Sequence, residues 1–173
     1  MLSTERLEEE DILSLYAAGR RDFCFTQISV GHLDGRDLSG INLTGASFDG
    51  GFISNTNLSG ACLFGATFNC VGIYGSNLTG ADFTNARFSG SGDCSNVDFT
   101  RCSMKNVVFT YADLRNSNFQ RVYDANGSIW INCDFTGANG FERIGEQFGG
   151  IGIWECIYPN GVKVVGGQGI LFS

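Results

Sequence analysis

Three segments decide the fold: Leu38-Ser-Gly-Ile-Asn-Leu-Thr-Gly, Leu58-Ser-Gly-Ala-Cys-Leu-Phe-Gly and Leu78-Thr-Gly-Ala-Asp-Phe-Thr-Asn align at separations of 20 residues. A shorter period runs inside them, because every fifth residue from 23 to 88 is Leu, Ile or Phe. These centres are Phe23, Ile28, Leu33, Leu38, Leu43, Phe48, Ile53, Leu58, Leu63, Phe68, Ile73, Leu78, Phe83 and Phe88. Internal repetition of this kind predicts a repeat architecture.

The columns beside the centres are also ordered. Small residues such as Ala46 and Ala81 stand two before a centre, Asp or Asn often stands directly before it, and Ser or Thr often follows. Two residues after the centre, nine of the fourteen positions are Gly and two are Asn, which both tolerate positive φ. A period of five fits neither a strand nor a helix, so the pattern predicts a chain that turns a corner after each pentapeptide. Four such sides close a square coil of 20 residues, with the centres stacked inside.

The register continues with Phe99, Met104, Phe109, Leu114 and Phe119 after one residue is added between 88 and 99. We expect Asp93 or Cys94 to bulge from the coil, on a face that is atypical in each turn. Asp124 then falls where a centre should be, and burying its charge would be costly, so we expect residues 123–127 to bulge outward. Ile129 resumes the register in this interpretation, and Phe135 requires a second insertion.

Units such as Ala46-Ser47-Phe48, Ala66-Thr67-Phe68, Ala81-Asp82-Phe83 and Ala112-Asp113-Leu114 resemble the pentapeptide repeat family, whose pattern is Ala-(Asp/Asn)-Leu-x-x. The resemblance covers residues 21–139, about 5–6 coils, and implies an all-β fold, a right-handed quadrilateral β-helix. The segment Leu15–Phe23 resembles the lead-in of cyanobacterial members. The motif residues are structural, so the resemblance implies the fold more strongly than any function.

Both ends of a β-helix need caps. Residues 1–20 are interpreted as an N-terminal capping helix from Ser3 to Ala18, with Ser3 or Thr4 as N-cap; an acidic docking helix is the alternative. Residues 140–173 are interpreted as a C-terminal β cap. It holds a β-hairpin of residues 151–158 and 162–165 around Pro159-Asn160-Gly161, with Gly169–Phe172 as a third strand. Residues 141–148 form a helical turn or a loop in this interpretation.

The net charge of −7, from 11 basic and 18 acidic residues, argues against a surface that binds nucleic acid. No apolar run is long enough for a membrane span, and the first residues lack the features of a secretory signal, so we expect a cytoplasmic protein. The seven cysteines have no metal-type spacing, and in that compartment they are expected to be reduced, buried side chains.

Catalytic chemistry finds no support in the residues. The only histidine, His32, has no nucleophile–base partner in the pattern, and Asp37, Asp82, Asp98 and Asp113 are explained by the repeat, where they can hydrogen-bond local backbone. The run Gly149-Gly-Ile-Gly-Ile-Trp lacks the third glycine and the helix of a dinucleotide loop. We therefore expect no enzyme, and no catalytic, cofactor-binding or metal site.

The sequence favours a non-enzymatic scaffold or regulatory protein–protein interaction module, a monomer or weak dimer whose partner is another protein. Candidate contact residues are the large outward side chains Phe52, Phe64, Tyr74, Tyr111 and Arg115, although Phe64 and Tyr74 fall on opposite sides of the square.

Two alternatives remain. The resemblance to family members that protect or inhibit DNA gyrase implies a DNA mimic, which needs an acidic stripe; here Arg36, Arg87, Arg101, Lys105, Arg115 and Arg121 are interleaved with the acids. The other alternative is a stable column without a partner.

Overall fold

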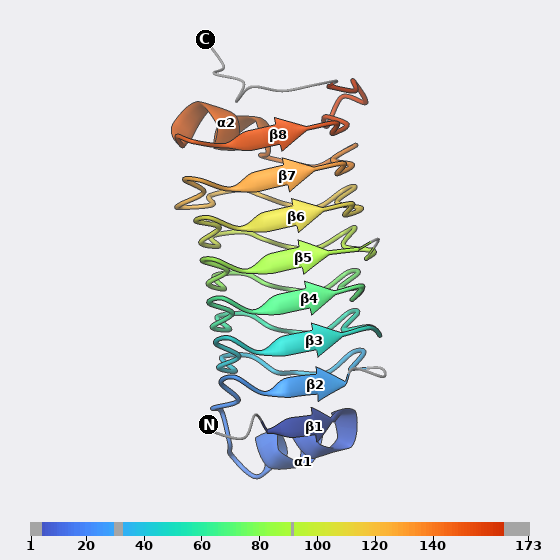
Figure 1. Ribbon diagram of the computed structural model, residues 1–173, viewed down its shortest axis with the longest axis vertical. Helices are drawn as coiled ribbons and strands as arrows, with labels where there is room; N and C mark the ends of the chain where they lie inside the picture. Colours follow the sequence, from blue (N-terminus) through green and yellow to red (C-terminus); the bar gives the residue numbers. More distant parts are fainter. Residues whose placement is uncertain (1–4, 30–32, 91, 165–173) are drawn as a thin grey trace.

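The chain forms a solenoid of about seven turns whose strands stack in sequence order (Figure 1). The computed structural model describes residues 5–29, 33–90 and 92–164. Eight three-residue strands make one parallel sheet. They are β1 (Arg6–Glu8), β2 (Gln27–Ser29), β3 (Ser47–Asp49), β4 (Thr67–Asn69), β5 (Arg87–Ser89), β6 (Val108–Thr110), β7 (Ile129–Ile131) and β8 (Gly152–Trp154). This is the quadrilateral β-helix that the period of five predicts.

Each turn has four sides, which we number from the sheet. Side 1 consists of the strands β2–β8. The other three sides are ladders of single β-bridges between successive coils. Side 2 contains Asp93, Asp113 and Asp134, side 3 contains Asp37, Asn57 and Asn77, and side 4 contains Asn42, Cys62 and Asp82. The chain bends at a residue with positive φ between sides, as at Gly45, Gly50, Asn55 and Gly60, where φ is 63°, 66°, 54° and 66°. The Gly and Asn column of the sequence therefore marks the corners.

The interior is a stack of apolar side chains. All nineteen side chains that the period places inward are buried, from Phe23 to Phe119. On side 1, the rings of Phe48, Phe68, Phe88, Phe109 and Trp130 form one stack with centroid separations of 4.7, 4.3, 4.3 and 4.8 Å. Adjacent rings are within 5° of parallel, so in-register coils place identical positions in direct contact.

The first inserted residue lies elsewhere than expected. Cys94 is only 1% exposed and occupies an inward centre, because Ile73 N–H donates to Asp93 O at 2.9 Å and Cys94 N–H donates to Asp113 O at 2.9 Å. The prediction that Asp93 or Cys94 bulges is therefore wrong. The extra length lies between Ser89 and Asp93, where Gly92 N–H donates to Gly90 O at 2.9 Å. Gly90, with a φ of 85°, provides the positive φ that the chain needs next to the extra residue.

The bulge near Asp124 contains two residues, Tyr123 and Asp124, rather than the expected five. Tyr123 N–H donates to Cys102 O at 3.1 Å, while Asp124 O accepts from Met104 N–H at 2.6 Å, so Tyr123 and Asp124 share one place in the ladder. Ala125 is buried as the next centre. The register resumes at Trp130 rather than Ile129, and Phe135 needs no second insertion. The larger apolar side chain goes to the stack, which explains the shift.

The N-terminal cap contains a strand before its helix. β1 places Leu7 opposite Ile28, and α1 (Glu9–Ala17) follows it, so the helix begins later than the expected Ser3. Ser3 and Thr4 lie outside the described residues. The Glu8 N–H donates to the Asp11 carboxylate at 3.0 Å at the start of the helix. Ile12 is buried against the first turn, which closes this end of the stack.

The C-terminal end adds another parallel strand before it turns back. β8 pairs with β7 in parallel, so residues 152–154 continue the sheet instead of forming the first arm of the hairpin. The hairpin forms around residues 159–161, where Ile157 and Lys163 pair antiparallel. Between β7 and β8, Phe141 and the helix α2 (Glu142–Gln147) cover the stack, and the Phe141 ring lies 3.7 Å from that of Phe135. The expected third strand at Gly169–Phe172 lies outside the described residues.

Neither of the two helices within residues 5–29, 33–90 and 92–164 has the length and apolar character needed to cross a bilayer.

Candidate protein-interaction surfaces

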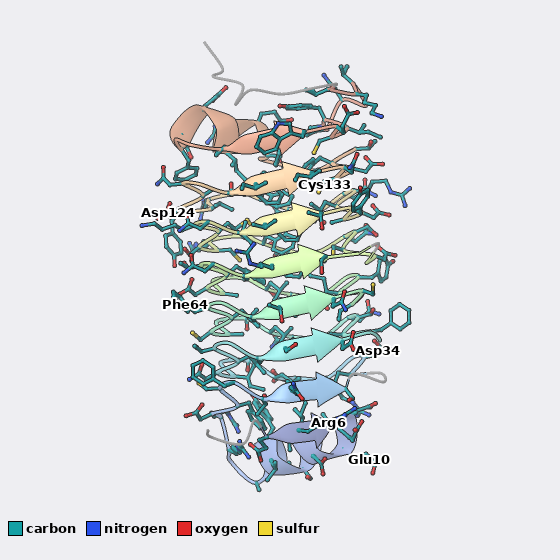
Figure 2. All side chains as sticks on the ribbon, in the orientation of Figure 1. Arg6, Glu10, Asp34, Phe64, Asp124 and Cys133 are labelled. Atoms are coloured by element: carbon teal, nitrogen blue, oxygen red, sulfur yellow. The ribbon has the colours of Figure 1, made fainter. Side chains whose placement is uncertain are left out.

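The five contact residues chosen from the sequence are all exposed. The exposed fractions of Phe52, Phe64, Tyr74 and Tyr111 are 47, 43, 41 and 60%, and that of the Arg115 side chain is 54%. Phe52, Tyr74 and Arg115 lie on side 2, and Tyr111 lies at the corner that leads to it, with a φ of 59°. Phe64 lies on side 4, and Figure 2 shows it at the opposite edge from Asp34 of side 2. The structure therefore brings four of the five to one side of the column.

On side 2, the ring of Phe52 packs against a glycine of the next coil. A Cβ atom on Gly72 would lie 2.7 Å from the Phe52 ring, so the ring packs against the coil that follows its own. Gly72 therefore covers part of the Phe52 ring, and only the remaining part is accessible to a partner.

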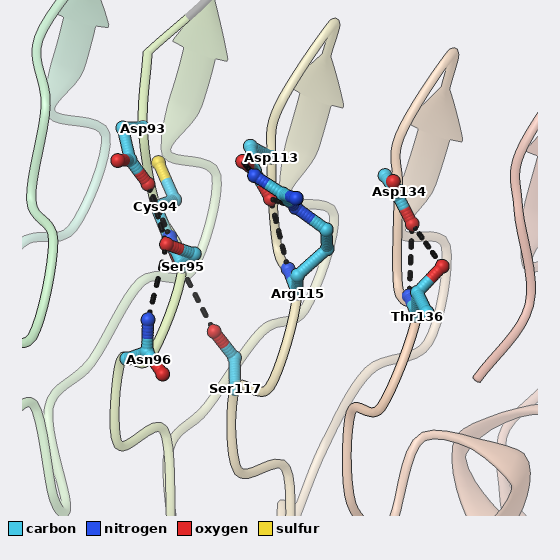
Figure 3. A network of polar contacts seen from close by, with 9 residues as sticks. All are labelled: Asp93, Cys94, Ser95, Asn96, Asp113, Arg115, Ser117, Asp134 and Thr136. Atoms are coloured by element: carbon cyan, nitrogen blue, oxygen red, sulfur yellow. Dashed lines mark hydrogen bonds and ion pairs between the residues drawn. The ribbon is translucent and has the colours of Figure 1, made fainter.

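Arg115 is already engaged with a carboxylate on side 2 (Figure 3). Its Nε donates to Asp113 Oδ1 at 2.8 Å, and its backbone N–H donates to the same oxygen at 3.1 Å. The hydrogen bonds and charge of Arg115 hold the pKa of Asp113 below its usual value. The guanidinium charge is therefore largely compensated within this chain.

Asp93, Asp113 and Asp134 form a column of acids on side 2, in register on successive coils (Figure 3). Each accepts a hydrogen bond from the backbone N–H two residues later; the distances at Ser95 and Thr136 are both 2.9 Å. Asp37, Asp82 and Asp98 do the same on other sides. These carboxylates brace the turns of the coil. Within the described residues no group of three or more His, Cys, Asp and Glu side chains could hold a metal, and His32 lies outside that part.

The cysteines are unpaired and mostly internal. All seven are free, and Cys94, Cys102, Cys133 and Cys156 are buried. The Cys102 thiol donates to Leu78 O at 3.0 Å. On side 3, the Thr56 and Ser76 hydroxyls at the equivalent place in the pentapeptide also donate to a carbonyl of the preceding coil. Burial raises the pKa of the Cys94 and Cys102 thiols to about 12, so both stay protonated and unreactive near neutral pH.

The most apolar outward surface was not predicted from the sequence. The outward residues of β2–β5 are all polar: Gln27, Ser29, Ser47, Asp49, Thr67, Asn69, Arg87 and Ser89. At the same positions, β6–β8 carry four apolar side chains, all partly exposed, together with Thr110 and Gly152. The four are Val108, Ile129, Ile131 and Trp154. We call these four residues the β6–β8 patch. Register pairs Val108 with Ile129 and Ile131 with Trp154, so the patch is continuous across three strands.

Two observations extend this patch. The Trp154 ring lies over Gly152, in space that a Cβ atom on that residue would occupy, so the indole covers the outer surface of β8. Tyr111 N–H donates to Ile131 O at 2.9 Å, which puts this exposed corner beside the patch. The signal was present in the sequence, but the register that placed Ile129 inward concealed it.

Comparison with known proteins supports the fold. The family model for pentapeptide repeats matches residues 32–69, 74–106 and 91–121, with 8 copies. The chain is similar to the structure of a pentapeptide repeat protein from the Arabidopsis thaliana thylakoid lumen, at 23% identity, 69% coverage of each chain and a TM-score of 0.43. No curated protein matches the chain.

Two further solved structures are similar at lower identity. One is HetL of Nostoc sp. strain PCC 7120, a pentapeptide repeat protein involved in heterocyst differentiation regulation, at 16% identity and a TM-score of 0.39; the match covers 91% of this chain and 100% of HetL. The other is QnrB1, a plasmid-mediated fluoroquinolone resistance protein, at 13% identity and a TM-score of 0.31, covering 88% of this chain and 78% of QnrB1.

Proposed function

The chain belongs to the pentapeptide repeat family, and on that premise we propose that it is a non-enzymatic protein-binding module. One observation carries the proposal: the outward positions of side 1 are all polar on β2–β5, whereas four of the six on β6–β8 are apolar side chains. The inward stack is complete without these side chains, so core packing does not account for the change. Contiguous apolar surface is typical of protein-interaction sites.

The proposed partner is another protein that presents an apolar surface to the β6–β8 patch. A flat face of short strands offers area rather than an enclosed pocket, which suits a protein better than a small molecule. Trp154 and Tyr111 supply the aromatic side chains that are enriched at interfaces. We propose Phe52 and Tyr74 on side 2 as secondary contacts. Phe64 lies on side 4, so a contact there would require a separate partner surface.

We also propose that the protein acts in the cytoplasm as a monomer or weak dimer. Seven free thiols suit a reducing compartment. Fractionation of the source cells tests the compartment, and sedimentation of the purified chain tests the oligomeric state.

The test uses a photo-crosslinking residue at Ile131, with Asn69 as the matched position on β4. We expect a discrete adduct with a second protein from position 131 and none from position 69. The partner is then purified, and its binding is measured directly. The double variant Ile129→Asp/Ile131→Asp should weaken binding by at least about ten-fold, or ~1.4 kcal/mol.

The control Ser47→Asp/Asn69→Asp adds the same charge at equivalent positions on β3 and β4 and should bind like the parent. Equal capture from positions 131 and 69, or equal loss in both double variants, would contradict the proposal. Adducts of the chain with itself alone would reassign the patch to a contact between two copies.

A further inference from the structure

The net charge of −7 conceals a local group of cations at the C-terminal end of the solenoid. Arg121 and Arg143 line one cavity of about 330 Å³, together with Gln120, Asn139 and Gly140. Arg121 lies at the corner between sides 3 and 4, whereas Arg143 belongs to α2, so two separate elements bring the residues to one hollow. From this geometry we propose that the cavity binds the phosphoryl group of a small ligand.

The two guanidinium groups form no ion pair in the part of the chain that the structure describes. Within residues 5–29, 33–90 and 92–164, no acidic residue is among those that line the cavity. Asp98 on side 3 and Asp124 on side 4 accept backbone hydrogen bonds within their own turns, from Thr100 and Asn126 at 2.9 Å. Two like charges on one hollow repel each other, and a doubly charged oxyanion between them would replace that repulsion with attraction.

The residue type at the Arg121 corner also supports the proposed site. The corner between sides 3 and 4 is glycine on the early turns, at Gly40, Gly60 and Gly80, with φ of 66°, 66° and 71°. On the later turns it is arginine, with φ of 60° at Arg101 and 57° at Arg121. Side chains rarely adopt this conformation, and both arginines are exposed, so folding gains nothing evident from them.

The cavity has an apolar extension. A neighbouring hollow of about 170 Å³ shares Arg121, Gly140 and Arg143 and adds the buried side chains of Phe119, Val122 and Ile144. A cationic rim over an apolar floor suits a small molecule with a phosphoryl group at one end. The guanidinium fork is the side-chain group best matched to phosphate oxygens, and the Gln120 and Asn139 amides supply further donors.

This inference is independent of the proposed protein-binding function. The cavity lies between side 3, side 4 and α2, whereas the β6–β8 patch lies on side 1. Substitutions at the arginines therefore leave the patch unchanged, and each proposal can fail without the other.

Calorimetric titration of the full chain with inorganic phosphate and, separately, with glycerol phosphate tests the site at low ionic strength. We expect saturable binding at millimolar ligand or below. Arg121→Gly and Arg143→Gln should each weaken it by at least about ten-fold. Arg121→Gly should also keep or raise the thermal midpoint, because glycine relieves the corner backbone; loss of binding then cannot be attributed to unfolding. Arg87→Gln, which removes an unpaired exposed cation on β5, should bind like the parent.

Tighter binding of glycerol phosphate than of phosphate would identify a phosphorylated metabolite as the ligand, and equal or weaker binding would identify the free ion. The absence of saturable binding for both, unchanged affinity in Arg121→Gly, or the same loss in Arg87→Gln would overturn the proposal.

Discussion

At the scale of single residues, position within the pentapeptide decides what each side chain does. The centre is buried, and its two neighbours are directed outward, so the same residue type has different consequences one place apart. Phe68 stacks between Phe48 and Phe88 at 4.7 and 4.3 Å, whereas Phe64 is 43% exposed four residues earlier. Stability therefore depends on the centres, and the proposed recognition depends on their neighbours.

Substitution of a stacked ring tests this division. Phe68→Ala removes a ring from both of its stacking contacts and leaves a cavity in the core, so we expect a loss of about 3–5 kcal/mol of unfolding free energy. Phe64→Ala should change stability by no more than about 0.5 kcal/mol. Urea unfolding followed by circular dichroism gives both values. Equal losses would show that the period of five does not separate inside from outside.

The pair of Asp113 and Arg115 gives a pH prediction. The folded pKa of Asp113 lies below that of an unfolded Asp, about 3.9, so the pair stabilises above that pH and is lost as the pH falls through the folded pKa. At pH near 7, Arg115→Gln should be slightly less stable than the parent, and the effect should be small because both side chains are partly solvated. The difference should shrink below pH of about 4. Urea midpoints across this range measure it, and a constant difference would exclude the ion pair as its cause.

At the scale of elements, a single side of one turn can accept an inserted residue without disturbing the neighbouring turns. The Tyr123–Asp124 bulge adds a residue to the ladder of side 4, and the neighbouring coils remain in register on the sheet. Tyr123 is 62% exposed, while Val122 beside it is buried. The bulge keeps a charge and a large ring outside and puts Val122 and Ala125 inside.

Deletion of Tyr123 should restore the strict period and be tolerated. We expect the thermal midpoint to move by no more than a few degrees, which corresponds to about 1 kcal/mol for a chain of this size. Deletion of Val122 shortens the chain equally but forces a tyrosine into a small inward place, so it should lose about 1–3 kcal/mol or more. Thermal melts of the two deletions provide the comparison. If both deletions melted alike, the assignment of the bulge would be wrong.

At the scale of the whole molecule, charge is distributed in short columns rather than in one field. The aspartate column of side 2 extends over Asp93, Asp113 and Asp134 and gives way to Gly72 and Phe52 on the preceding coils. Arg115 is paired within it. A duplex presents one phosphate charge per ~1.7 Å of axis, and this column imitates neither its length nor its continuity.

We therefore expect no inhibition or protection of DNA gyrase in a supercoiling assay at micromolar protein. An acidic DNA mimic used as a positive control should act in the same assay and lose its effect as salt rises. A salt-sensitive effect of this chain would contradict the expectation and favour mimicry of DNA over the protein-binding function proposed above.

The sequence by itself determined the repeat, the square coil, its corners and the nineteen stacked centres, because each depends on local spacing that five residues already contain. Only the tertiary structure decided where the extra residues lie. Several positions in a turn can hold an inserted residue, and the local sequence does not distinguish between them. Trp130, rather than Ile129, lies inward, where it stacks on Phe109. As a consequence, Ile129 and Ile131 point outward and form part of the β6–β8 patch. The cavity of Arg121 and Arg143 likewise requires α2 to fold back over the last coil, a contact between elements that no pentapeptide encodes.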